Sequence, residues 1–226
     1  MKNLLTKKMK KSKIKIGISL RVVEEKNYTE KRDALSQNWT TFLEEINILP
    51  VFIPNTLSNL RSFLENMEIC GIILSGGDNI GDHPERDKTE KEIIAFGIEN
   101  EIPIFGVCRG MQVVNKYFGG KIIQKVGSDH VGKSHKITFT NEVFSSLLQA
   151  SSIEVNSYHH NVITNEGLGT DLEPFAISSD DTIEGFYHKL LPIEGVMWHP
   201  ERDQNSYNKI ILNKFFQEKA FWRNQG

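Results

Sequence analysis

The sequence has few cysteines and no long apolar run. Cys70 and Cys108 are its two cysteines among 226 residues, whereas small secreted domains held by disulfides are far richer in them. A reducing, cytoplasmic location is therefore favoured. No stretch approaches the ~18 apolar residues that a membrane-spanning helix needs, so no contact with a membrane is expected.

The sequence also lacks an excess of charge of one sign. Its 27 Lys and Arg residues nearly balance 29 Asp and Glu residues, which gives no electrostatic reason to expect a nucleic-acid partner. Charge is concentrated only at the start, where seven of the first 15 residues are lysine. No apolar stretch of ~7–15 residues follows, as a secretory signal would require, so residues 1–13 are predicted to be a solvated basic tail. A tether to a membrane or to nucleic acid is the alternative.

Internal repeats and low-complexity linkers are absent as well, which favours one domain over residues 14–226. Short apolar runs alternate with amphipathic stretches, and this pattern predicts an α/β fold of three layers, with helices on both faces of a mainly parallel sheet. Strands are expected at 14–20, 49–53, 70–74, 103–107 and 193–198, and helices at 33–45, 57–66, 90–99, 109–118 and 206–222. Short runs at 136–139, 153–155 and 175–178 predict a smaller antiparallel element.

Cys108 lies between two glycines at a predicted strand-to-helix turn. The Gly-Val-Cys-Arg-Gly segment at 106–110 has the pattern of a nucleophile elbow, in which larger side chains at the glycines would collide with neighbouring backbone. Such a turn lifts the sulfur above the carboxyl ends of parallel strands, and the positive end of the next helix favours the thiolate. We interpret Cys108 as a nucleophile, and Cys70 as a small buried hydrophobic residue.

His199 is the sharpest candidate for a general acid/base near this sulfur. It follows an apolar strand in Gly-Val-Met-Trp-His-Pro-Glu at 195–201, so it is expected at the same edge of the sheet. Glu201 is two residues further on, and on an extended chain both side chains point the same way. The carboxylate can hold one ring nitrogen while the other faces the sulfur. A partly exposed loop histidine beside a solvated glutamate is the alternative.

The adjacent His159 and His160 are rival candidates for the base. No carboxylate or thiol stands near them at metal-ligand spacing, and one distant cysteine does not complete a ligand set with His199. No metal and no other cofactor are therefore expected. We interpret the two histidines as parts of a pocket wall or of its support.

Acyl transfer to sulfur forms a tetrahedral oxyanion, which is stabilised by two backbone N–H donors. One is expected from Arg109, the residue after the nucleophile. The other is expected from Gly77 in the Ser-Gly-Gly-Asp loop at 75–78, which follows a strand predicted to neighbour the elbow strand. A Gly-Gly pair alone is usually just a turn, so its value lies in this position.

In this order the motifs resemble the class I glutamine amidotransferase-like family, and within it the γ-glutamyl-γ-aminobutyrate hydrolase-like group. The resemblance spans about residues 14–215. The matching segments are Leu-Arg at 20–21, Arg-Asp-Ala-Leu at 32–35, Ser-Gly-Gly-Asp at 75–78, Gly-x-Cys-Arg-Gly-x-Gln at 106–112, Val-Asn-Ser-x-His-His at 155–160 and Gly-Val-x-Trp-His-Pro-Glu at 195–201.

The resemblance implies a flavodoxin-like α/β fold and a triad of Cys108, His199 and Glu201, which forms a γ-glutamyl thioester that water releases. It also implies which residues hold the glutamyl part of the substrate: Gly76, Gln112, Asn156, Ser157, Tyr158 and His159. The implied candidate substrates are γ-glutamyl-CDP-amidate, as in capsule phosphoramidate synthesis, and γ-glutamyl-aminobutyrate or a γ-glutamyl polyamine. Relatives usually carry Gln where this chain has Asn161, so that wall of the pocket is expected to differ in shape.

The lysine-rich stretch at 121–136 matches no motif of the family. We interpret it as a solvated loop face, and contact with an anionic leaving group such as a phosphate is the alternative.

A stand-alone hydrolase of a small-molecule γ-glutamyl conjugate is the leading hypothesis for function. The first alternative is a glutaminase subunit that delivers ammonia to a separate synthase, although no synthase domain is fused here. The second is a binding or sensor protein without activity, against which the intact nucleophile, base and acid argue. A homodimer is compatible with the sequence.

A glutamine-like electrophile separates an enzyme from a binding protein. We expect it to label the protein stoichiometrically and the label to be lost in Cys108→Ala, together with turnover, because the sulfur is the attacking atom. Mass spectrometry of the intact protein and release of glutamate measure the two effects. Unchanged turnover in Cys108→Ala would contradict the assignment.

Overall fold

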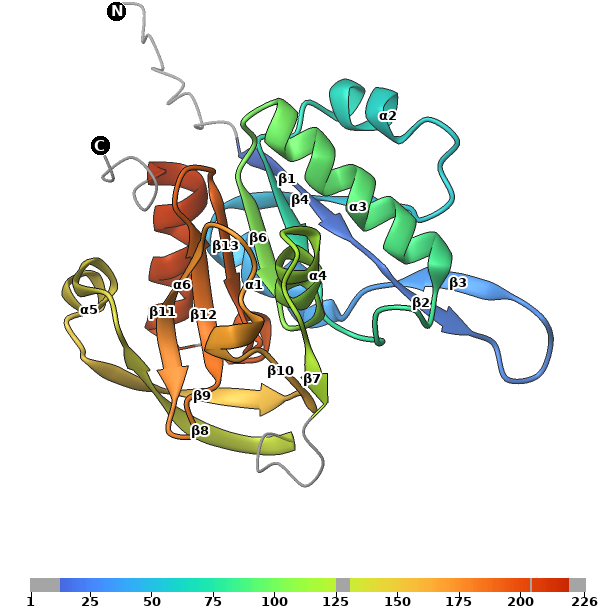
Figure 1. Cartoon of the computed structure of the whole chain (residues 1–226). Helices are drawn as coiled ribbons and strands as arrows, with labels where there is room; N and C mark the ends of the chain where they lie inside the picture. The colour runs from blue at the N-terminus through green and yellow to red at the C-terminus, as the bar shows by residue number, and fades with distance from the viewer. Residues whose placement is uncertain (1–12, 125–130, 204, 220–226) are drawn as a thin grey trace, which may run out of the picture.

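The computed structural model describes residues 13–124, 131–203 and 205–219, and within these ranges the main feature is a sheet of nine strands (Figure 1). The strand order is β4-β1-β5-β6-β13-β12-β11-β8-β9, and the first five strands are parallel while the last four are antiparallel. The parallel strands are β1 (Ile14–Ser19), β4 (Ile48–Ile53), β5 (Gly71–Leu74), β6 (Ile104–Val107) and β13 (Ile193–Val196). The antiparallel strands are β8 (Val131–Phe139), β9 (Ser152–Tyr158), β11 (Leu172–Ser178) and β12 (Ile183–His188).

Helices cover both faces of this sheet and bury a separate apolar cluster on each. One face carries α1 (Gln37–Glu45), α5 (Glu142–Leu148) and α6 (Ser206–Asn213), and the other α2 (Leu60–Met67), α3 (Pro84–Glu99) and α4 (Arg109–Tyr117). In Figure 1, α3 and α4 lie in front of the sheet and α1 behind it. The predicted three-layer α/β fold, with its smaller antiparallel element, is confirmed.

Short elements complete the described chain. The pair β2 (Arg21–Glu24) and β3 (Lys31–Ala34) forms a hairpin that extends from the sheet in Figure 1, and β7 (Ile123–Gln124) pairs with β10 (Asn161–Val162). Single helical turns occupy Asn165–Gly167, Pro200–Arg202 and, directly after α6, Lys214–Glu218. Of the predicted basic tail, residues 1–12 lie outside the described residues.

Several predicted helices have different limits in the structure. The helix expected at 90–99 begins at Pro84, and the one expected at 57–66 runs from Leu60 to Met67. The helix expected from residue 33 begins at Gln37 behind the cap Ser36, because Asp33 belongs to β3 and its carboxylate accepts hydrogen bonds from Asn55. The closing helix ends at Asn213 and gives way to a wider π-type turn, and residues 220–222 of its expected range lie outside the described residues. The start of α1 was therefore decided by a contact between Asp33 and Asn55, which are 22 positions apart in the sequence.

The strand β12 was not predicted from the sequence, because the charged Glu184 interrupts its run of apolar residues. Glu184 in this strand is completely buried, and a buried carboxylate does not follow the apolar alternation by which strands are recognised. The prediction for Cys70 was wrong: this residue precedes β5 and is exposed, with its sulfur 3.8 Å from the carbonyl oxygen of Glu68. The buried residues of β5 begin one position later, at Gly71.

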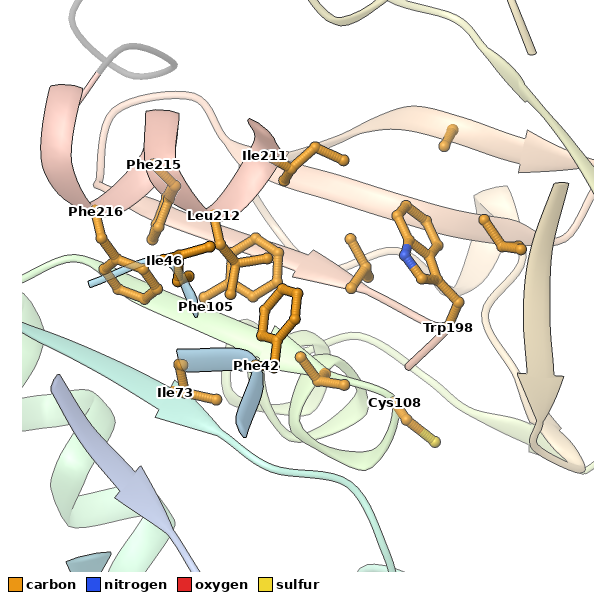
Figure 2. Packing of buried hydrophobic residues seen from close by; sticks show 14 of the residues in the cluster. Phe42, Ile46, Ile73, Phe105, Cys108, Trp198, Ile211, Leu212, Phe215 and Phe216 are labelled. Atoms are coloured by element: carbon orange, nitrogen blue, oxygen red, sulfur yellow. The ribbon is translucent and has the colours of Figure 1, made fainter. Parts of the chain in front are cut away.

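Aromatic rings fill the core beside the elbow strand. Phe105 of β6 is completely buried, and its ring centroid lies 5.3 Å from that of Phe215 and 6.3 Å from that of Phe216. Figure 2 shows these rings in one cluster with Cys108 at its margin, the sulfur directed away from the packed rings. The elbow therefore rests on a tightly packed base.

Phe105→Ala should lower the free energy of unfolding by about 3–5 kcal/mol, because it leaves a cavity that the neighbouring rings cannot fill. Denaturant-induced unfolding measures this change. Leu190→Ala is the matched control, since Leu190 is 81% exposed and its truncation should have little effect. A similar loss in both variants would contradict the packing described here.

Candidate active site

Four neighbouring parallel strands end at the same edge of the sheet. The chain leaves β1 toward Arg21, β5 toward Gly76 and Gly77, β6 into Cys108 and β13 toward His199. Side chains at the carboxyl ends of adjacent parallel strands meet in space even when they are far apart in the sequence. The topology thus brings residues from four segments to one place.

The elbow has the tight geometry that its glycines predicted. Cys108 has φ +51° and ψ −106° and caps the N-terminus of α4. A Cβ atom at Gly106 would lie 2.7 Å from the nitrogen of Met111, and one at Gly110 only 2.0 Å from the carbonyl oxygen of Leu74. Only glycine fits at these positions, and the strained backbone of the nucleophile costs roughly 1–3 kcal/mol.

His199 lies beside Cys108 and is held by Glu201. Its Nδ1 is 2.7 Å from Oε1 of Glu201, and a Cβ atom at Gly76 would meet both the His199 ring at 2.7 Å and Cβ of Cys108 at 3.5 Å. Burial lowers the pKa of His199, but hydrogen bonding to Cys108 and to Glu201 outweighs burial and raises the pKa to about 9. The ring is thus kept protonated next to the sulfur at neutral pH.

Asn156 fixes the backbone of His199 from the antiparallel half of the sheet. Its side chain donates to the carbonyl oxygen of His199 at 2.8 Å and accepts from the backbone N–H of the same residue at 2.9 Å. Both ends of the amide are therefore used within the protein. Asn156 was predicted to hold substrate, whereas this geometry gives it the task of positioning His199.

Two cavities open at this edge of the sheet. The first, of about 360 Å³, brings Cys108 together with six other predicted site residues, which are Gly77, Arg109, Gln112, Tyr158, His159 and His199. The second, of about 260 Å³, is lined by Gly76 as well as His199 and Glu201. Asn156 and Ser157 line neither cavity, and Ser157 is buried on the opposite face of β9.

A buried ionic network supports the loop between β5 and α3, and it was missed from the sequence. Arg86 of α3 is completely buried and donates to the carbonyl oxygens of Ser75 at 2.9 Å and of Gly76 at 3.0 Å. Its Nε also donates to Glu90 at 3.0 Å, and Glu90 pairs with Arg109 of the elbow helix. The four-residue spacing of Arg86 and Glu90 is a signal that could have revealed this pair.

His159 belongs to a buried cluster around Glu184. Its Nε2 lies 3.5 Å from one oxygen of Glu184, and Nε2 of His135 lies 3.4 Å from the other. The Nδ1 of His159 is 3.0 Å from the carbonyl oxygen of Asn161.

Within the described ranges, no group of three His, Cys, Asp or Glu side chains could hold a metal ion. The prediction of no cofactor remains a prediction.

The lysine-rich stretch divides into different parts. Residues 131–136 belong to β8 rather than to a loop, and residues 125–130 lie outside the described residues. Of the lysines here that the structure describes, none lines either cavity.

Among the described helices, none is long and apolar enough to cross a membrane.

The fold and the site together define a cysteine-dependent hydrolase of the glutamine amidotransferase class. The defining features are a cysteine on a strand-to-helix elbow, a histidine paired with glutamate, and a mainly parallel α/β sheet. The chain belongs to the Peptidase C26 family, whose model matches residues 15–201.

The chain is similar both to a hydrolase and to components of synthases. It is 34% identical to the γ-glutamyl-CDP-amidate hydrolase of Campylobacter jejuni, over 89% of this chain and 96% of that enzyme. It is also 34% identical to anthranilate synthase component 2 of Cyanophora paradoxa, over 81% of this chain and 93% of that protein. A solved structure of a GMP synthase component from Thermoplasma acidophilum shares the fold with a TM-score of 0.70 at 24% identity, covering 93% of this chain and 96% of that one.

The pKa of His199 predicts an alkaline limit to activity. Cleavage of an amide needs a protonated ring to donate to the leaving nitrogen, and a group with a pKa of about 9 loses that proton as the pH rises through 9. We expect kcat/KM to fall above that pH, with a limb that reports the Cys108–His199 pair as a unit. A flat profile between pH 6 and 10 would contradict this geometry.

Glu201→Gln should move the same limb to lower pH, because the carboxylate is one of the groups that raise the pKa of His199. The loss of kcat should be roughly 10–100-fold smaller than in Cys108→Ala, since an orienting acid does not itself react. Steady-state kinetics across the pH range measure both effects. Equal losses in the two variants would mean that Glu201 has another role.

Proposed function

We propose that this protein hydrolyses γ-glutamyl-CDP-amidate to glutamate and the nucleotide amidate. One observation carries the proposal: the match to the Campylobacter jejuni hydrolase, named for this substrate, extends over nearly the full length of both chains. The open cavity beside Cys108 and the His199–Glu201 pair supply the groups that cleavage of a γ-glutamyl amide needs. A role in capsule phosphoramidate synthesis stays a prediction from the resemblance.

In the first half of the reaction, the thiolate of Cys108 attacks the γ-carbonyl carbon and forms a tetrahedral oxyanion. Backbone N–H groups of Gly77 and Arg109 are our proposed donors to that oxygen, because both residues line the cavity that holds the sulfur. When the intermediate collapses, the carbon–nitrogen bond breaks and the nitrogen takes the proton of His199. The amidate leaves, and the γ-glutamyl group remains on sulfur as a thioester.

In the second half, water attacks the thioester carbon while neutral His199 takes a proton from it. The carbon–sulfur bond then breaks, glutamate leaves, and the thiolate and protonated ring are restored. Gln112, Tyr158 and His159 are the residues proposed to hold the glutamyl part, since they line the same cavity as Cys108. Glu201 orients His199 through both steps.

The alternative function is a glutaminase subunit that delivers ammonia to a separate synthase. Similarity to anthranilate synthase component 2 favours it, because that name denotes one component of a larger enzyme. The two functions differ in their dependence on a partner. A stand-alone hydrolase is fully active alone, whereas hydrolysis of glutamine by a glutaminase component would rise sharply on adding its synthase.

We also infer a cytoplasmic location. An exposed free thiol at Cys70 and a nucleophilic thiol at Cys108 both persist best in a reducing compartment.

A turnover screen of four γ-glutamyl amides tests the substrate. The purified protein is given the nucleotide-linked amidate, γ-glutamyl-aminobutyrate, a γ-glutamyl polyamine and glutamine, and glutamate release is measured, with Cys108→Ala as the control. We expect the highest kcat/KM with the nucleotide amidate. A higher value with any other amide would overturn the proposed substrate while leaving the hydrolase chemistry in place.

A further inference from the structure

The two cavities at the active edge meet at a common border. Four residues line both of them, and these are Arg21, Gly77, His199 and Arg202. Cys108 lines only the larger cavity. The smaller cavity is bounded instead by residues 34–36, between β3 and α1, and by Trp39 of α1. Its function is not explained by the binding of the glutamyl group.

The chemistry assigns a different part of the substrate to each side of this border. The acyl group becomes attached to the sulfur, so it must occupy the cavity that holds Cys108. The leaving nitrogen takes its proton from His199, so the group attached to that nitrogen must lie along the His199 ring. The smaller cavity is the space that His199 borders and Cys108 does not.

Positive charge is concentrated at the border itself. The side chains of Arg21 and Arg202 are 45% and 36% exposed, so their guanidinium groups retain contact with solvent and with any ligand. Arg202 is held over the ring of Tyr158, with its guanidinium carbon 4.4 Å from the ring centroid. Arg21 passes within 3.3 Å of a Cβ atom built at Gly77, next to the proposed oxyanion donor.

The acidic groups nearby have other partners as well. Asp78 accepts from Arg21 at 2.7 Å, but its second oxygen accepts from the buried Arg86 at 3.2 Å. Glu201 is 2.7 Å from His199 and 3.7 Å from Nε of Arg202. Each exposed guanidinium group has five N–H donors, so donors remain for an anionic ligand.

We propose that the smaller cavity is the subsite for the leaving group, and that Arg21 and Arg202 bind a phosphate attached to the scissile nitrogen. This inference rests on the proposed function, which makes that nitrogen part of a phosphoramidate. In such a substrate, phosphorus is bonded directly to the nitrogen, so its oxygens lie beside His199 at the border of the cavities. Planar guanidinium groups bind phosphate oxygens through paired, charge-assisted hydrogen bonds.

The pair of arginines also fits the chemical step. When the carbon–nitrogen bond breaks, the nitrogen receives the His199 proton and the amidate departs with the negative charges of its phosphates. Arg21 and Arg202 hold these charges at the border of the two cavities. Neutral leaving groups, such as ammonia or an amine, gain nothing from them, so the arginines select the substrate class.

Titration calorimetry with inorganic pyrophosphate tests the subsite without requiring turnover. Pyrophosphate should bind the wild-type protein, and the Kd should rise about tenfold in Arg202→Gln and further in the double variant Arg21→Gln/Arg202→Gln. Arg202→Lys should be intermediate, because it keeps the charge but loses the paired geometry. Arg61→Gln is the matched control, since Arg61 is an exposed arginine of α2 that pairs with Glu99. No binding to the wild type, or equal binding to the double variant, would overturn the subsite.

Kinetics separate this inference from the proposed function. The ratio of kcat/KM for γ-glutamyl-CDP-amidate to that for glutamine should fall about tenfold in Arg202→Gln and stay constant in Arg61→Gln. If the wild type binds pyrophosphate through the arginines but prefers another amide, the subsite stands and the proposed substrate fails. If it prefers the nucleotide amidate and the ratio is the same in the double variant, the substrate stands and the subsite fails.

Discussion

The site depends on one close contact, the approach of the α4 N-terminus to the end of β5. At Gly110 the backbone of the helix comes so near the carbonyl oxygen of Leu74 that a methyl group would overlap it, at 2.0 Å. Because of this contact, the elbow and the loop that follows β5 share one wall of a cavity. Gly76 in that loop lies close to Cys108, since a Cβ atom at Gly76 would be 3.5 Å from Cβ of Cys108, and the His199 ring packs against the same glycine. A larger residue at 110 would separate these parts.

Buried ion pairs also hold the loop after β5 close to the start of α4. Arg86 and Glu90 of α3 connect the carbonyl groups of the loop after β5 to Arg109 at the start of α4. Buried ion pairs add little net stability, because desolvation offsets their attraction, but removal of one partner leaves a costly unpaired charge. Here the ion pairs fix the position of the loop after β5 relative to α4. Asn156 of the antiparallel strand β9 fixes the backbone of His199 in a similar way. In both cases, side chains from another element hold a short segment that follows the end of a strand.

The ring of His199 lies between two parts of the site that have different functions. His199 borders the cavity for the acyl group and the smaller cavity beside it, so one side of the site determines the γ-glutamyl chemistry and the other the leaving group. A fold by itself does not determine the group that is released, so relatives that share this fold can act within different reactions. Arg21 and Arg202 lie at the border of the two cavities, beside His199.

The alternation of strands and helices, the elbow around Cys108 and the pairing of His199 with Glu201 could all be predicted from the sequence. These features depend on neighbours within a few positions, where periodicity and glycine spacing act directly. Three features became clear only in the folded structure. They are the strand β12 with its buried Glu184, the start of α1 at Gln37, and the contacts that Asn156 and Arg86 make with distant segments. Each of these results from groups brought together across the sheet, and the energies that select them come from desolvation and hydrogen bonding between segments that are distant in the chain. Local sequence can reveal the Arg86–Glu90 pair within α3, but not the partners that these side chains find in other segments.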